Sequence, residues 1–357
     1  MTHALRFHIV TLLAGALLSV AASAQQGRGL KVLLLYDMEG ITAADDYRKT
    51  TFAHPEQYRQ GRRSLTDDVN AAIAGLAAGG AAEIVVVDGH GSGNNDSPDV
   101  IVEEIRKPGA MHFRSTPFDI YMDSYDHSID AIVAIGMHAG AGNRAGFLAH
   151  TYNAHDIEYR VNGVPFNETM ILAMGAARLR IPVVMVSGDD QLERELRRNL
   201  PWVKYAAVKH AVNVGKAEPL PRDEASRRIE AAARDAMQSL AQMKVMEFPG
   251  PYRFAAKFEE PSQAEHAALW PGSELNADEL TVQIRANDFE DGYRTSLRLL
   301  GLAGAARGAA SAQAAIRKLP NATEIRQGMT DWSYDRWING VPLPAPSAPG
   351  TRFWGAR

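Results

Sequence analysis

Acidic and histidine side chains follow three apolar runs of the sequence, each within three residues of the end of the run: Asp37 with Glu39, His90, and His138. Asp37 and Glu39 are two positions apart, so in an extended chain they point to the same side. Carboxylates and imidazoles are the zinc ligands that a chain without cysteine can offer. The pattern indicates a metal site, and hydrogen-bonded loop residues are the alternative interpretation.

Two further residues extend this set. His150 lies in the segment Leu-Ala-His-Thr, and Glu168 lies at the start of a predicted helix. Two metal ions that share a bridging ligand need more carboxylates than one ion does. Histidines together with three carboxylates therefore fit a binuclear site better than a mononuclear one. The HExxH helix motif of common zinc peptidases is absent from the sequence, so it gives no support.

Three other acids are candidates for supporting roles. Asp88 ends an apolar run just before His90, where it is a candidate for orienting an imidazole ring. Asp189 and Asp190 end another run, and capping of the next helix is the alternative interpretation for them.

The elements that must position these residues alternate along the chain. Continuous apolar runs predict buried strands, and helical spacing predicts helices between them. The predicted strands are 30–36, 83–88, 131–136 and 182–186, and the predicted helices are 64–79 (capped by Ser64), 169–179 and 223–243. This order predicts an α/β fold with a mainly parallel sheet flanked by helices. Ligands of such sheets lie beyond the carboxyl ends of the strands, where the candidate residues are.

The sequence divides into four predicted parts. Residues 25–246 form the metal-binding α/β catalytic domain, and residues 247–305 form a smaller α+β C-terminal lobe of the same enzyme unit. This lobe has predicted strands at 252–258 and 280–286. Residues 306–357 are predicted to be a C-terminal helix and a tail that is irregular from Pro320.

Residues 1–24 have the pattern of a secretory signal peptide. A 14-residue uncharged run, 9–22, leads into the small-residue site Ala22-Ser23-Ala24. A membrane anchor is the alternative, but the run is shorter than the roughly 20 residues that span a bilayer. We therefore expect cleavage after Ala24, a periplasmic or secreted protein, and no stable membrane anchor.

Composition excludes several classes of protein. The 357 residues include no cysteine, which excludes a disulfide scaffold, a thiolate nucleophile and an iron–sulfur cluster. Lys and Arg number 38 against 42 Asp and Glu, a net charge of −4 that argues against nucleic-acid binding.

Seven short motifs occur in the order typical of one known family. They are Asp37-Met38-Glu39-Gly40-Ile41, Tyr58 with Gly61, Arg62 and Thr66, Asp88-Gly89-His90, Gly136-Met137-His138-Ala139, His150, Asn162-Gly163 before Glu168, and Ser187-Gly188-Asp189-Asp190. With these motifs the chain resembles the zinc-dependent D-aminopeptidases, a family of binuclear metallopeptidases, over about residues 29–305. Two features depart from that family: the signal peptide, since the family prototype is cytoplasmic, and the tail after about residue 305.

The resemblance implies specific roles for the candidate residues. Asp37, Glu39, His90, His138 and Glu168 are the implied ligands of two zinc ions per chain, and His150 is the implied catalytic residue. It also implies a substrate, namely a short peptide that contains D-amino acids, and a ring-shaped homo-oligomer, of which a decamer is one candidate size.

Two alternatives remain at this point. One is another metal-dependent amidase, an esterase or an L-aminopeptidase that uses the same site. The other is an exported protein that binds peptide or metal without turnover.

Overall fold

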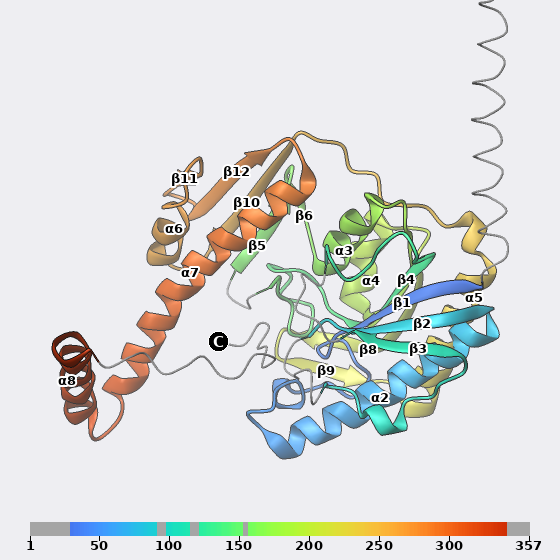
Figure 1. The fold of residues 1–357 in the computed structure, drawn as a ribbon, viewed down its shortest axis with the longest axis horizontal. Coiled ribbons are helices and arrows are strands. Elements are labelled where there is room, and N and C mark those ends of the chain that lie inside the picture. The colour runs from blue at the N-terminus through green and yellow to red at the C-terminus, as the bar shows by residue number, and fades with distance from the viewer. Residues whose placement is uncertain (1–28, 91–97, 115–120, 153–155, 341–357) are drawn as a thin grey trace, which may run out of the picture.

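The computed structural model describes residues 29–90, 98–114, 121–152 and 156–340, and a seven-stranded sheet forms its body (Figure 1). The strand order is β3-β2-β1-β4-β7-β8-β9, and every pair is parallel except β8 with β9. The strands are β1 (Leu30–Tyr36), β2 (Ala81–Asp88), β3 (Ala110–Arg114), β4 (Ala131–Met137), β7 (Val183–Asp189), β8 (Lys204–Asn213) and β9 (Lys216–Pro219). The predicted mainly parallel α/β fold is confirmed, although β3, β8 and β9 were not predicted. The predicted signal peptide lies outside the described residues.

Helices cover both faces of this sheet because its central strands are apolar on both sides. Val32 and Leu34 of β1 pack into one cluster with α2 and α5, whereas Leu33 and Leu35 pack into another with α3. The helices are α2 (Pro55–Ala78), α3 (Glu168–Ala177), α4 (Asp190–Asn199) and α5 (Arg222–Gln238). None of the helices in the described residues is long and apolar enough to cross a membrane.

The first helix begins nine residues before its predicted start. Proline is favoured in the first turn of a helix, and α2 begins at Pro55. Ser64, predicted as its N-cap, instead lies inside the helix, where its hydroxyl accepts a hydrogen bond from the amide of Ala43 at 3.0 Å. The prediction was wrong because the polar first half of α2 lacks an apolar stripe.

A second, antiparallel sheet forms the smaller lobe (Figure 1). Its strand order is β11-β12-β10-β5-β6, with the strands β5 (Asp156–Val161), β6 (Val164–Pro165), β10 (Tyr252–Phe258), β11 (Glu274–Asn276) and β12 (Thr281–Ala286). The helices α6 (Pro261–Ala267) and α7 (Phe289–Arg317) pack with it. The hairpin of β5 and β6 comes from inside the predicted domain 25–246. A sequence boundary at residue 247 therefore does not separate the two sheets.

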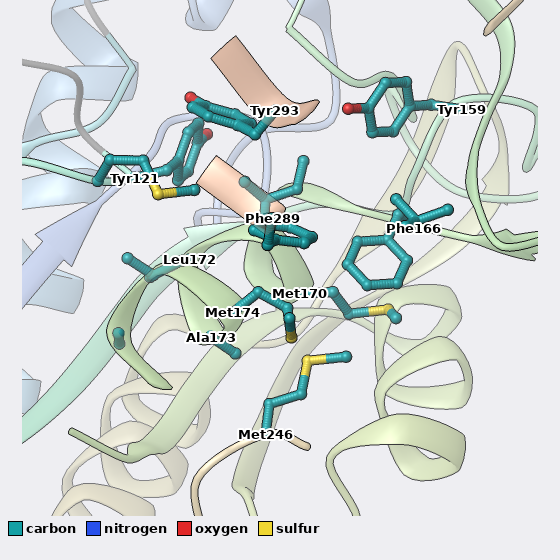
Figure 2. Close-up of a cluster of buried hydrophobic side chains, with 14 of the residues drawn as sticks. Tyr121, Tyr159, Phe166, Met170, Leu172, Ala173, Met174, Met246, Phe289 and Tyr293 are labelled. Atoms are coloured by element: carbon teal, nitrogen blue, oxygen red, sulfur yellow. The ribbon is translucent and has the colours of Figure 1, made fainter. Parts of the chain in front are cut away.

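Buried aromatic and methionine side chains join the lobe to the body (Figure 2). Phe289 of α7 lies beside Met170 and Met174 of α3 and near Phe166, and Tyr293 of α7 lies beside Tyr121. Full burial of each such side chain contributes roughly 1.5–3 kcal/mol. This cluster holds α3, the helix that begins at Glu168, against the smaller lobe.

The C-terminal part differs from its prediction. Instead of an irregular chain from Pro320, the structure has a second helix, α8 (Ala322–Asn339), which ends at Gly340 with a φ of 64°. It follows the far end of α7, away from the main sheet (Figure 1). Most of the α8 side chains are exposed, so no buried stripe imposed a periodic apolar pattern from which the helix could be predicted.

One buried acid on α2 gives the stability of the protein a testable pH dependence. The carboxylate of Asp68 on α2 accepts hydrogen bonds from the amide and the hydroxyl of Thr42, both at 2.8 Å. Burial raises its pKa from 3.8 to about 6 in spite of these bonds. Between these two pH values the folded protein binds more protons than the unfolded chain. Its stability therefore falls as pH rises through this window, and the loss is complete above about pH 6.

In the wild type, Asp68 should lower the unfolding free energy by on the order of 3 kcal/mol between pH 4 and pH 6. Asp68→Asn is expected to remove this contribution to the pH dependence. The amide can accept from the Thr42 amide and donate to its hydroxyl, so the fold is retained. Urea unfolding over a pH series measures the effect. The control is Asp67→Asn, which removes a partly exposed carboxylate paired with Arg222. An unchanged slope in Asp68→Asn contradicts the prediction.

Candidate metal centre

The ends of β1 and β4 are joined just beyond the sheet. The amide of Asp37 donates to the carbonyl of Ile135 at 2.8 Å, and the amide of Gly40 donates to the carbonyl of Gly136 at 2.7 Å. These bonds continue the pairing of the two strands past Tyr36. They place the Asp37–Glu39 segment directly against His138.

His138 lies at the centre of the site and is 1% exposed. Its Nδ1 donates to the carbonyl of Ala139 at 2.9 Å, which leaves Nε2 facing carboxylates. Nε2 lies 3.4 Å from Asp37 Oδ2 and 3.5 Å from Glu168 Oε2. Burial by itself lowers the pKa of His138, but the charges of Glu168 and Asp37 outweigh it and raise the pKa well above its ordinary value. The position between the carboxylates therefore favours a positive charge.

The three carboxylates respond to their surroundings in different ways. Burial and the charge of Glu39 raise the pKa of Asp37 to about 7. Burial also opposes ionisation of Glu168, but His138 outweighs it and holds the pKa of Glu168 at about 2. The pKa of Glu39 is likewise well below its ordinary value, because His90 outweighs the effect of burial.

His90 lies beside Glu39, although it belongs to neither of the two groups of described residues that could hold a metal ion. Its Nε2 lies 3.2 Å from Glu39 Oε1, and its Nδ1 lies 3.4 Å from Asp99 Oδ2. Asp99 is fully buried and was not identified in the sequence. Asp88, the predicted orienting residue, accepts a hydrogen bond from the main-chain amide of His90 at 3.0 Å. The imidazole is thus oriented by Asp99.

Three residues of the second sequence motif hold the segment 98–101, which carries Asp99. The hydroxyl of Tyr58 donates to the Asp99 carboxylate, and the guanidinium of Arg62 donates to three consecutive carbonyls at 2.9–3.0 Å. Thr66 Oγ1 accepts from the amide of Ile101 at 2.9 Å. The motif therefore supports the site from α2 through Asp99.

Glu168 is the first residue of α3, and it is positioned by the helix cap and by two hydrogen bonds to its carboxylate. Asn167 caps the helix by accepting from the amide of Met170 at 2.9 Å. The amide of Tyr152 donates to Glu168 Oε1 at 2.7 Å, and the hydroxyl of Tyr121 donates to Oε2. Neither tyrosine was identified in the sequence, since each is distant from Glu168 along the chain.

His150 stacks on His138, with ring centroids 4.0 Å apart and planes 9° apart. Its Nδ1 donates to the carbonyl of Leu148 at 2.6 Å, so Nε2 is the nitrogen that remains for chemistry. Leu148 and Tyr152, two residues to either side, have positive φ values of 47° and 62°. Such strain is concentrated at functional sites. Burial, followed by the charge of His138, lowers the pKa of His150.

These residues fit zinc. Among the described residues, two overlapping groups can hold a metal ion: Asp37, Glu39 and His138, and His138, His150 and Glu168. Within the described chain, His138 Nε2 and Glu39 Oε2 are buried without a hydrogen-bond partner. Tetrahedral zinc with bonds of 2.0–2.2 Å separates its ligand atoms by roughly 3.3–3.6 Å. The 3.4 and 3.5 Å separations around His138 Nε2 match that spacing.

The chain matches a family model described as D-aminopeptidase (peptidase M55) over residues 30–297. The chain belongs to the D-aminopeptidase family. A curated D-aminopeptidase of Bacillus subtilis (strain 168) is 28% identical over 277 residues, which cover 77% of this chain and 98% of that protein. The solved structure described as "Zn-dependent D-aminopeptidase DppA from Bacillus subtilis, a self-compartmentalizing protease" matches with a TM-score of 0.69 and 27% identity, again over 77% and 98% of the two chains.

Two other acids of this D-aminopeptidase family member have structural roles. Asp189 is the N-cap of α4 and accepts from the amides of Gln191 and Leu192 at 3.0 and 2.9 Å. Asp190 accepts from the amide of Ala211 at 2.9 Å. The capping interpretation is confirmed for Asp189.

A substitution at Gly136 tests whether the contact between the ends of β1 and β4 positions the metal site. Its φ is +75°, and a Cβ there would lie 2.2 Å from the carbonyl oxygen of Asp37. We expect Gly136→Ala to cost more than the roughly 1–2 kcal/mol of a left-handed alanine, because Asp37 must also move. Thermal unfolding with zinc analysis measures both effects.

The matched control is Gly163→Ala. Gly163 has a similar φ of +80° but no neighbouring atom within 4 Å of the added Cβ, so it reports the backbone cost alone. Equal losses of stability in the two variants, with unchanged zinc in Gly136→Ala, contradict the prediction.

Proposed function

We propose that this chain is an exported D-aminopeptidase that hydrolyses the N-terminal peptide bond of short peptides at a binuclear zinc site. The assignment as a zinc-dependent aminopeptidase rests on the family match over residues 30–297 and on the D-aminopeptidases it resembles. The observation that carries the site is the convergence of carboxylates on His138 Nε2 at 3.4 and 3.5 Å.

Five side chains are the proposed zinc ligands: Asp37, Glu39, His90, His138 and Glu168. His138 is the residue shared by the two overlapping groups that can hold an ion, and its Nε2 is the atom that would bind zinc. Bound zinc supplies Lewis acidity for the scissile carbonyl and a water nucleophile at neutral pH. Asp99, Tyr121 and the Tyr152 amide keep His90 and Glu168 oriented toward it.

His150 is the proposed proton carrier. Since its Nδ1 is bonded to the Leu148 carbonyl, Nε2 is the atom that takes up a proton from the nucleophile and gives it to the leaving amine. Its lowered pKa leaves this nitrogen unprotonated at neutral pH, as a base must be. The Leu148 carbonyl and the stacking on His138 fix the direction of the ring.

Assembly and export extend the proposal. The similar Bacillus subtilis structure is described as self-compartmentalizing, which supports a homo-oligomer here. We propose a ring-shaped homo-oligomer, with a decamer as one candidate size. Light scattering that gives a monomer contradicts this part. Residues 1–24 are the proposed signal peptide of a periplasmic or secreted protein. Mass spectrometry of the exported form should show a new N-terminus at Gln25, whereas retained Met1 contradicts export by cleavage.

The function is tested with matched D- and L-aminoacyl amides, dipeptides and p-nitrophenyl esters, together with metal analysis. We expect two zinc ions per chain, preferential turnover of D-aminoacyl substrates, and loss of turnover on chelation. Faster turnover of L-substrates or of esters favours the other hydrolases. Full zinc occupancy without turnover of any of these substrates favours a binding protein.

A further inference from the structure

We propose that Glu195 is a positioning residue of the metal centre, which sets the separation between the segments that carry His138 and Glu168. Its Oε2 accepts hydrogen bonds from the amide of Gly140 at 3.1 Å and from Nδ2 of Asn167 at 2.8 Å. Its Oε1 accepts from Nδ2 of Asn143 at 2.7 Å. One carboxylate thus ties two segments distant in sequence.

These contacts lie next to proposed ligands. Gly140 is two residues after His138, and Asn167 is immediately before Glu168. The two segments pack so closely that a Cβ on Gly140 would lie 3.1 Å from the Cβ of Asn167. A shift of either segment therefore changes the 3.5 Å separation between His138 Nε2 and Glu168 Oε2.

Glu195 comes from a helix that is itself fixed. Leu192 and Leu196 of α4 are buried, and the Asp189 cap also accepts from the amide of Phe147 at 2.9 Å. Residues three and four apart share a helix face, so the buried leucines orient Glu195 toward the site segments. The Glu195 carboxylate is thus held by α4, a helix that carries none of the proposed ligands.

Glu195 acts through other residues and does not touch the reacting atoms. It lines a cavity of about 420 Å³ between α4 and the β5–β6 hairpin, whose other lining residues include Gly140, Asn143 and Phe166. No proposed zinc ligand lines that cavity, and neither does His150. The described hydrogen bonds of the carboxylate go to residues of the two segments and not to the proposed ligands themselves.

The test compares zinc affinity, measured by chelator competition, in wild type and Glu195→Gln. The amide keeps the shape of the side chain but has one acceptor oxygen for three donors. We expect zinc affinity to fall by about 10–100-fold, the typical effect of losing a residue that orients a ligand. Glu193→Gln is the matched control on the same helix, because Glu193 pairs only with Arg197, at 2.9 Å, among its described contacts.

A second pair of variants separates positioning from folding. Asn167→Asp keeps the oxygen that caps α3 but turns the Glu195 contact into a repulsion, so it should lower zinc affinity similarly. Combining it with Glu195→Gln restores a donor–acceptor pair with its direction reversed. The double variant should therefore bind zinc more tightly than Asn167→Asp alone. A general loss of stability predicts no such recovery.

The outcomes distinguish this inference from the proposed function on which it rests. Wild-type protein that binds no zinc contradicts the proposed function itself. If the wild type binds zinc, two results would overturn only the role of Glu195. One is an unchanged zinc affinity in Glu195→Gln, and the other is the absence of recovery in the double variant. Thermal unfolding of the zinc-free proteins checks folding, and if Glu195→Gln does not fold, Asn167→Asp with the double variant decides.

Discussion

His138→Ala is expected to lower zinc affinity by more than about 100-fold and to leave less than about 1% of wild-type turnover. The reason is that losing a residue that only orients a ligand already lowers metal affinity or activity by about 10–100-fold. The side chain belongs to both groups that can hold an ion. Its removal also leaves the buried carboxylates of Asp37 and Glu168 without the nitrogen that both face at 3.4 and 3.5 Å. Both proposed metal positions should therefore be affected.

Zinc content after dialysis and kcat with a D-aminoacyl amide measure this effect. His266→Ala is the control, because His266 is exposed and bonds only to the carbonyl of its own helix at Ser262, at 2.8 Å, among its described contacts. Retention of two zinc ions and of turnover in His138→Ala would overturn the site. Retention of one ion would assign His138 to a single metal position.

His150→Ala is expected to keep its zinc but to lose turnover by about 10²–10⁴-fold, the usual contribution of a positioned acid or base. The expectation follows from the geometry of the ring. Its Nδ1 is bonded to the carbonyl of Leu148 at 2.6 Å, and its face is stacked on His138 at 4.0 Å. Only Nε2 remains to move a proton.

The alternative for His150 is a ligand role, since it also belongs to a group that can hold an ion with His138 and Glu168. Metal analysis separates the two roles: loss of zinc in His150→Ala indicates a ligand, and retention with low kcat indicates proton transfer. Recovery of turnover on addition of free imidazole supports proton transfer further. Full turnover in the variant contradicts both roles.

Much of the body of the fold could be predicted from local patterns. Residues 32–36 are buried on both faces of a parallel sheet, so this stretch is apolar without interruption, and β1 has the predicted bounds 30–36. The residues just beyond such strands meet at one edge, which is why Asp37 and His138 could be grouped without a structure. The lobe strand 252–258 alternates because one face is buried, and β10 matches it.

Features with no local signature could not be predicted. β5 and β6 belong to the smaller sheet because β5 pairs with β10, nearly 100 residues later, and nothing near residue 156 indicates this partner. The helix α8 was missed because it has few buried side chains.

The sequence by itself determined which residues can do chemistry here. With no cysteine, the candidate ligands had to be imidazoles and carboxylates, and their places after apolar runs indicated one shared edge. The tertiary structure decided which residues hold them: Asp99 beside His90, Tyr121 on Glu168, and Glu195 across the two ligand-bearing segments. The physical reason is that a ligand's identity is a local chemical property. Its orientation depends on hydrogen bonds from segments that only folding brings together.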